Sequence, residues 1–262
     1  MRPAAESPPM LHAPLLPAAP CVLRAALALL LLLSAAPLAA RTVMVEAAAP
    51  GQALPELSPD VSALHLRGFG AERIFTLRPS EALRELNLSD NALPVLPERF
   101  LPPTLTRLWL ADNRLMRLPD SLGACRSLVY LNAERNLLDR LPPLAELPLR
   151  WLRLNGNRLE TLPPLPPTLE RLYAADNRLR AVPELPPACR QVTLAGNPLE
   201  ALPAGWGAGL ELLDLSRTPL SSLPADLAPW RSLKCLNLTR CPLSEAERDR
   251  IEAALPETFL LF

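Results

Sequence analysis

Apolar and polar residues follow a repeating frame through the middle of the chain. Asparagines at positions 157, 177 and 197 are spaced by about 20 residues, and the leucines around them keep the same offsets. Shortly before each asparagine, two apolar residues flank one variable residue, as in Leu152-Arg153-Leu154. This alternation is typical of a short β-strand with one buried face. The frame therefore predicts one short strand in each repeat.

The same frame extends to both sides, over residues 61–243. The asparagine position is filled at 91, 113 and 136 upstream, and by Thr218 and Cys241 downstream, which gives about nine coils of 20 to 23 residues. One coil has a single apolar edge that it cannot bury alone, so neighbouring coils must stack into a continuous core. Each buried leucine then contributes roughly 1.5–3 kcal/mol. We expect the asparagine amides to bond backbone groups that are buried between coils.

The segments between the strands are rich in proline. Residues 162–167 read Leu-Pro-Pro-Leu-Pro-Pro and residues 182–187 read Val-Pro-Glu-Leu-Pro-Pro, which places prolines where a helix needs backbone donors. We expect these segments to be extended. The longer copies, such as residues 118–128, have room for one helical turn. The sequence thus predicts a mostly β solenoid whose outer face is mostly extended.

These repeats resemble a known family. Residues 162–179 read LPxLPxxLxxLxxxxNxL, which resembles the 20-residue class of leucine-rich repeats found in bacterial type III secreted effectors. The longer copies resemble the general leucine-rich-repeat class. The resemblance covers residues 61–243 and implies a curved leucine-rich-repeat solenoid with a parallel β-sheet on its concave face. It does not imply a shared function, because one fold hosts many functions.

Residues 1–40 have the layout of a signal peptide or a membrane anchor. A basic residue, an apolar run at 25–33 and a stretch of small residues follow one another. The apolar stretch is short for a membrane span, and Met10 is an alternative start. Two interpretations stay open: a cleaved signal, or an uncleaved anchor in which residues 21–40 contact the membrane. Residues 41–60, rich in alanine and proline, are expected to be a linker.

Residues 244–262 are predicted to cap the last coil. Ser244 and Glu247 match a capping box at the start of a short helix, and Pro256 ends that helix. The apolar tail at 258–262 would then cover the apolar edge that the last coil otherwise exposes.

Composition and cysteine spacing argue against several functions. The chain has 27 basic and 27 acidic residues, so no overall field favours nucleic acid. Cys125, Cys189, Cys235 and Cys241 are scattered singly through the frame, and we interpret them as small core residues and not as a disulfide framework. The chain has only 2 histidines and no metal-ligand spacing, so we expect no metal and no cofactor.

The sequence also assembles no catalytic site. A cysteine nucleophile needs a neighbouring base, and His65 lies several coils away from the outward-facing Cys235. Some effectors of this class carry a separate ligase domain with a cysteine nucleophile. Here only residues 244–262 follow the repeats, and no cysteine of the repeats has that family's aspartate two positions later. We therefore expect neither a ligase domain nor an enzyme.

A binding function should be visible in the outward residues of the strands. In the third to sixth coils these positions are rich in tryptophan, tyrosine and arginine, namely Arg107, Trp109, Tyr130, Trp151, Arg153, Arg171 and Tyr173. Because neighbouring strands are about 4.8 Å apart, these side chains should lie within roughly 15–20 Å of one another. The same residue types are enriched at binding hot spots, and arginine pairs well with carboxylates. The sequence predicts a concave binding surface for a protein with a partly acidic surface.

Two alternatives stay open for these residues. The arginines and rings can stack on one another as a ladder of cation–π contacts, worth about 0.5–1 kcal/mol each when exposed. They can also hold nucleic acid bases, which the zero net charge disfavours. In every case the outward residues should tolerate change better than the core. We expect Leu154→Asp to collapse several coils and Arg153→Asp to leave folding intact.

The sequence favours a non-enzymatic protein-binding module that is exported from a bacterial cell. It would be secreted or periplasmic, or membrane-anchored if the N-terminal segment is not cleaved. The alternative is a host-directed effector that reaches the host cell by type III secretion and binds or scaffolds a host signalling protein.

Overall fold

The computed structural model of the 262-residue chain describes residues 41–46, 58–69, 74 and 81–262. The predicted signal peptide or anchor, residues 1–40, lies outside the described residues, as do residues 47–57 of the predicted linker. Within the described part of the chain, no helix is long and apolar enough to cross a membrane.

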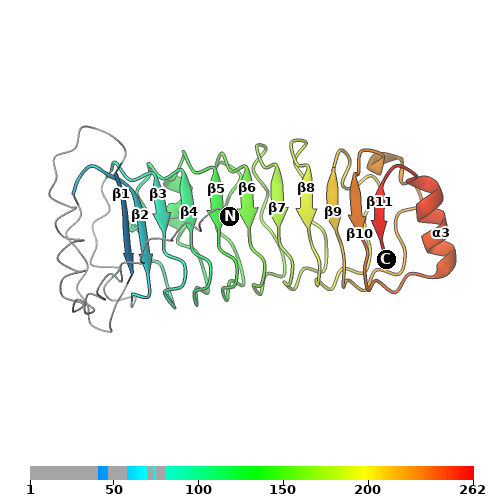
Figure 1. Cartoon of the computed structure of the whole chain (residues 1–262), viewed down its shortest axis with the longest axis horizontal. Coiled ribbons are helices and arrows are strands. Elements are labelled where there is room, and N and C mark those ends of the chain that lie inside the picture. Colours follow the sequence, from blue (N-terminus) through cyan, green and yellow to red (C-terminus); the bar gives the residue numbers. More distant parts are fainter. Residues whose placement is uncertain (1–40, 47–57, 70–73, 75–80) are drawn as a thin grey trace, which may run out of the picture. The chain divides into compact units, whose positions relative to one another are not determined.

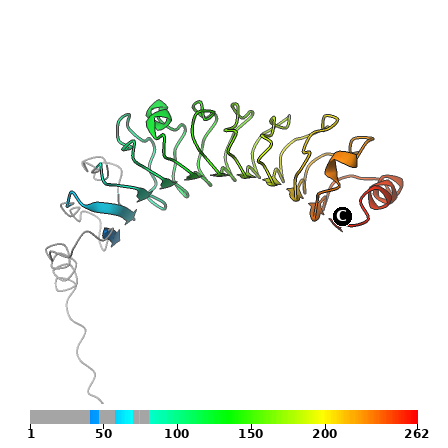
Figure 2. The same cartoon turned by 90° about the horizontal axis from the view of Figure 1, so that it is seen from above.

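The strands form one 11-stranded parallel sheet in which each strand pairs with the strand that follows it in the sequence (Figure 1). They are β1 (Arg41–Glu46), β2 (Val61–Arg67), β3 (Glu85–Asn87), β4 (Arg107–Trp109), β5 (Tyr130–Asn132), β6 (Trp151–Arg153), β7 (Arg171–Tyr173), β8 (Gln191–Thr193), β9 (Leu212–Asp214), β10 (Cys235–Asn237) and β11 (Phe259–Leu261). The row of coils curves, and Figure 2 shows the strands along its inner side. The predicted parallel sheet on a concave face is confirmed.

One apolar residue at the middle of each strand from β2 to β10 contributes to the core row. These residues are Leu64, Leu86, Leu108, Leu131, Leu152, Leu172, Val192, Leu213 and Leu236, and each is paired with the next across the sheet. None of them is more than 2% exposed. Their neighbours on the same strands are mostly half-buried or exposed. The predicted inward register of the leucines is therefore confirmed.

The asparagine column joins the coils, as predicted. Asn113 Nδ2 donates to the carbonyl oxygens of Leu88 at 2.9 Å and Leu110 at 3.0 Å, and its Oδ1 accepts from the backbone N–H of Leu93 at 2.8 Å. One amide thus bonds its own coil and the coil before it. The same pattern recurs at Asn136, Asn157, Asn177 and Asn197. These bonds satisfy buried backbone groups that would otherwise cost about 1–3 kcal/mol each.

The outer legs contain little regular structure, as the prolines predict. Two of the longer coils have a 3-10 turn on this side, η1 (Asp120–Ala124) and η2 (Ala228–Trp230). The proline-rich legs at 162–167 and 182–187 contain neither helix nor strand.

The N-terminal end of the sheet differs from the prediction. The predicted linker, residues 41–60, begins with strand β1, which pairs in parallel with β2. Val43 is buried there, whereas its neighbours Thr42 and Met44 are exposed. The segment Arg-Thr-Val-Met-Val-Glu is rich in β-branched residues, which favour a strand. Residues 41–46 therefore belong to the sheet and are not part of a tether.

The C-terminal cap has the predicted helix, α3 (Glu245–Ala254), and the Ser244 hydroxyl accepts from the backbone N–H of Glu247 at 3.2 Å. The Glu247 carboxylate departs from the capping box. It pairs with Arg250 at 2.7 Å and accepts from the backbone N–H of Leu223 at 2.7 Å, and the Arg250 bond and this N–H lower the pKa of that carboxyl. The tail also differs, because it forms β11 beside β10 and leaves Phe259 64% exposed. The tail therefore adds a strand to the edge of the sheet, whereas the prediction was that it covers the apolar edge of the last coil.

Candidate functional site

The seven residues predicted for binding all lie on the concave side of β4 to β7. We term them the concave patch: Arg107, Trp109, Tyr130, Trp151, Arg153, Arg171 and Tyr173. One row, in register across four strands, consists of Arg107, Tyr130, Trp151 and Arg171. The second row consists of Trp109, Asn132, Arg153 and Tyr173. The structure thus brings all seven together, while their binding role stays a prediction.

The rings of the patch contact one another in a continuous run. The ring centroids of Trp109 and Tyr130 are 5.2 Å apart, and those of Tyr130 and Trp151 are 5.8 Å apart in an edge-on arrangement. Toward the N-terminal coils, the imidazole of His65 lies 6.2 Å from Trp109. These distances are typical of favourable aromatic pairs. The run therefore reaches from β2 to β6 and begins two strands before β4, where the predicted patch begins.

Two arginines of the patch lie over rings on neighbouring strands. The guanidinium carbon of Arg171 is 4.6 Å from the centroid of Trp151. That of Arg153 is 5.3 Å from the centroid of Tyr173. Both distances are within the range of cation–π attraction. The self-stacking ladder that the sequence left as an alternative is therefore present.

Two arginines also have carboxylate partners that the sequence did not indicate. Arg107 pairs with Glu85 at 2.9 Å. The Nε of Arg153 lies 3.2 Å from Glu134 Oε1, although it is not aligned for a hydrogen bond. Asn155 Nδ2 donates to the same Glu134 oxygen at 2.6 Å.

Glu134 is unusual because it is an acidic residue of the concave side that is only 5% exposed. A buried carboxylate needs a charged or hydrogen-bonding partner, and Arg153 supplies the charge. Burial alone would lower the pKa of the Arg153 guanidinium, but the negative charge of the nearby Glu134 carboxylate, together with Tyr130, raises it above its ordinary value. The Arg153–Glu134 pair is therefore part of how this face is built.

The patch still presents surface to solvent despite these contacts. Trp151 is 40% exposed, and the side chains of Arg107 and Arg153 are 54% and 40% exposed. Its rings and guanidiniums are held in place by their neighbours and remain accessible from the concave side.

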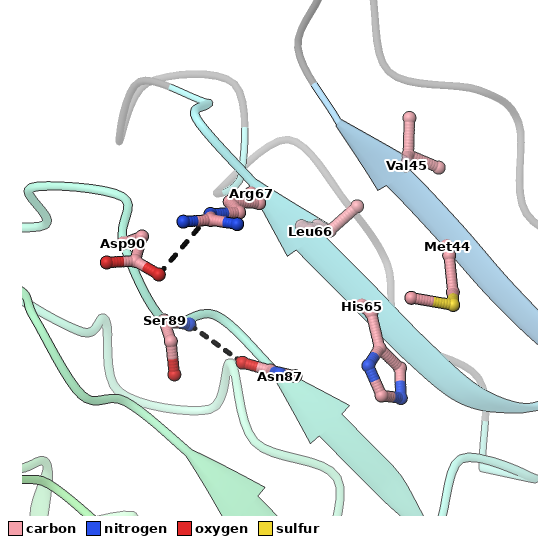
Figure 3. Close-up of a pocket in the computed structure, with 8 residues that line it drawn as sticks. All are labelled: Met44, Val45, His65, Leu66, Arg67, Asn87, Ser89 and Asp90. Carbon is pink, nitrogen blue, oxygen red and sulfur yellow. Dashed lines mark hydrogen bonds and ion pairs between the residues drawn. The ribbon is translucent and has the colours of Figure 1, made fainter.

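A small pocket lies beside the patch, at the C-terminal ends of β1 to β3 (Figure 3). Its volume is about 220 Å³, and it is lined by Met44, Val45, His65, Leu66, Arg67, Asn87, Ser89 and Asp90. Figure 3 shows Met44 and His65 on the same side of adjacent strands, and Arg67 Nε lies 3.3 Å from Asp90. Small-molecule pockets usually hold about 300–1,000 Å³. The volume of this pocket is below that range.

The cysteines behave as small core residues. Cys125, Cys189 and Cys241 are buried, and Cys235 is half-buried on β10. Burial raises the pKa of Cys125 and of Cys189 to about 11, so both thiols are protonated and poor nucleophiles at neutral pH. In the described part of the chain, no group of three or more histidine, cysteine or acidic residues could hold a metal ion.

Comparisons with known proteins agree with this geometry. No family model matches the chain. Podocan-like protein 1 from Homo sapiens is 35% identical over 196 residues, which cover 68% of this chain and 38% of that protein. YopM from Yersinia enterocolitica WA-314 superposes with a TM-score of 0.68 at 27% identity and covers 85% of this chain. The leucine-rich-repeat domain of a Shigella effector superposes with a TM-score of 0.57 at 28% identity and covers 69% of this chain.

The shared feature is the repeat architecture. This chain spans 38% of podocan-like protein 1 and 46% of YopM, so it corresponds to less than half of either protein. A solenoid of this kind offers an extended concave surface for binding. With its parallel strands, its buried leucine row and its asparagine column, the chain is a leucine-rich-repeat protein whose repeats resemble those of bacterial effectors.

Proposed function

We propose that the chain is a non-enzymatic module that binds a protein through the concave patch and that acts after export from a bacterial cell. The proposal rests on the continuous run of rings from His65 to Trp151, with Trp151 40% exposed. Apolar area on a solvent-facing sheet gains free energy when a partner covers it, at roughly 25 cal/mol per Å². Tryptophan, tyrosine and arginine are also the residues that most often dominate binding energy.

Contacts inside the patch support binding instead of competing with it. Each ring is already held by its neighbours, so little side-chain freedom is left to lose when a partner arrives. Ordering a flexible side chain on binding costs about 0.5–1.5 kcal/mol. The ladder of stacked rings therefore makes the surface preorganised.

A protein partner fits this surface better than a small molecule does. The rings lie on an open sheet face, whereas small ligands are usually enclosed in a concave pocket. The pocket at β1 to β3 adds a place for a partner's side chain at one end of the run of rings.

Two routes of export are compatible with the proposal. Residues 1–40 favour a protein that acts in the envelope or outside the cell. The likeness to YopM and to the Shigella effector domain, at 27% and 28% identity, favours a host-directed effector that binds or scaffolds a host protein. Fusing residues 1–60 to a reporter separates the two, because only the first route moves the reporter through the general secretory pathway. A reporter that stays in the cytoplasm with and without a type III apparatus would contradict both.

The binding surface is tested by capture from bacterial envelope and host extracts with the full chain. The variant is Trp109→Ala/Trp151→Ala, and the control is Met116→Ala, because Met116 is 61% exposed and lies outside the strands. We expect the wild type and the control to retain the same partner and the double variant to bind it at least about tenfold more weakly. If the double variant unfolds at the wild-type temperature and still retains every partner, the concave patch is not the binding surface.

A further inference from the structure

The three arginines of the concave patch differ in how their charge is compensated. Arg107 is paired with Glu85 at 2.9 Å, and Arg153 lies 3.2 Å from Glu134. The two carboxylates cancel two of the three positive charges and leave one. An acidic partner therefore does not meet three available cations on this face.

The remaining charge belongs to Arg171. Among the described residues, no carboxylate lies within ion-pair distance of its guanidinium. The adjacent Glu170 is engaged elsewhere, because it accepts from Arg150 Nε at 2.8 Å. What holds Arg171 is the ring of Trp151, 4.6 Å away. Arg171 is thus fixed in position while its charge stays uncompensated.

A guanidinium held over a ring is well suited to bind a carboxylate. Its N–H groups lie in the plane of the group, so stacking one face on an indole leaves the donors at its edge available. Arginine–carboxylate contacts are often bidentate and stronger than neutral hydrogen bonds. Gln191, which is paired with Arg171 across β7 and β8, accepts from the Tyr173 hydroxyl at 3.3 Å through Oε1, and its amide N–H groups can therefore donate.

We infer that Arg171, supported by Trp151, is a subsite for one aspartate or glutamate side chain of the bound protein. The rings of Tyr130 and Trp109, next along the run, take apolar side chains that flank this acidic residue. The partner segment thus carries one carboxylate beside apolar or aromatic residues and is not broadly acidic. This inference rests on the proposed function and narrows the partner that the sequence indicated.

The test starts from a library of random peptides displayed on phage, with their C-termini fused to the coat protein so that no free C-terminal carboxylate is present. The full chain is the bait, and selected peptides are synthesised with an amidated C-terminus. Their dissociation constants are measured for the wild type and for Arg171→Met. The control is Glu211→Gln/Lys234→Met, which removes an exposed ion pair outside the concave patch without changing the net charge.

We expect the selected peptides to share one acidic residue next to apolar residues. Arg171→Met should weaken their binding about tenfold, and the control should change it by less than about threefold. Replacing the peptide's acidic residue by its amide should weaken binding to the wild type by a similar factor. The same replacement should have no further effect in Arg171→Met, because the two groups act as one contact.

The outcomes separate this inference from the proposed function. Peptides that depend on Trp109 and Trp151 but bind Arg171→Met as tightly as the wild type would overturn the carboxylate subsite and keep the binding surface. The carboxylate subsite at Arg171 would also be overturned if replacing the peptide's acidic residue by its amide had no further effect in Arg107→Met but kept its effect in Arg171→Met. A library that yields no peptide sensitive to the two tryptophan replacements would contradict the binding surface itself. Arg171→Met loses the cation–π contact with Trp151 but no ion pair, so we expect its unfolding temperature to stay close to that of the wild type. Measuring that temperature tests whether misfolding causes the loss of binding.

Discussion

The inward and outward faces of β6 make different kinds of contact, although their residues are neighbours in the sequence. Leu152 faces a row in which nearly every strand offers another leucine, and it is fully buried. Trp151 and Arg153, on either side of it, each have individual partners, Arg171 for one and Glu134 for the other. Repetition fixes the inward face, whereas the outward face depends on which residues happen to meet. Residues of the outward face can therefore vary more freely than the leucines of the core row.

Replacing a core leucine should have the largest effect. Leu154, directly after β6, is 0% exposed, and none of the buried residues in the described part of the chain is a cation, so Leu154→Asp places an unpaired carboxylate in the core. We expect a loss of about 4 kcal/mol or more, measured by urea denaturation followed by circular dichroism. The control is Thr161→Asp, which makes the same charge change on the exposed outer leg of the same coil and should cost less than about 0.5 kcal/mol. Equal urea midpoints for the two variants would contradict the register.

An intermediate effect is expected at Arg153, and here the structure revises the expectation drawn from the sequence. Arg153→Met leaves Glu134, whose side chain is 7% exposed, without its charge partner. Since Arg153 is itself 40% exposed, we expect a loss of about 1–2 kcal/mol, less than for a fully buried pair. Arg153→Asp should cost more, because it sets a second carboxylate beside Glu134, so this outward position does not tolerate charge reversal. Adding Glu134→Gln to Arg153→Met should restore most of the loss, and the absence of any recovery would show that the pair is not responsible.

The smallest effect is expected at the exposed pair of the same face. The side chains of Arg107 and Glu85 are 54% and 31% exposed, and exposed ion pairs contribute about 0–1 kcal/mol. Arg107→Met should therefore lower the free energy of unfolding by less than about 0.5 kcal/mol, and less still in high salt. A loss as large as that of Arg153→Met would mean that burial does not distinguish the two pairs.

Most of the fold could be predicted from the sequence, because the leucine spacing states directly which side chains face inward. The asparagine column was predictable for the same reason, since Asn113 and its equivalents must bond the backbone of adjacent coils. The end strands were not. The C-terminal tail was predicted only to cover the core, but it forms β11 beside β10. β1 was missed because it lies before the first leucine of the repeating frame. The alternation around Val43 was the available signal for β1, but it is a single copy and lacks the period that identified the others.

The site was predictable only in part. The positions of Trp109, Trp151 and the other patch residues follow from the strand alternation, and the strand spacing brings them together. Glu134 was missed because it lies beyond the end of β5, where alternation no longer gives the direction of a side chain. His65 was missed because its contact with Trp109 reaches two strands across the sheet, further than direct pairing indicates. Which arginines of this face lack a carboxylate partner depends on contacts of this kind, so it could not be predicted from the sequence.

The most direct test of the central claim is site-specific photo-cross-linking. A photoreactive phenylalanine derivative replaces Trp151 in one variant and Met116, which is 61% exposed and outside the strands, in another. Each variant is irradiated in the extract from which the wild type captures its partner, and the cross-linked species are identified by mass spectrometry. A partner that cross-links at position 151 and not at position 116 is the predicted result. Cross-linking at position 116 alone would contradict recognition through the concave face.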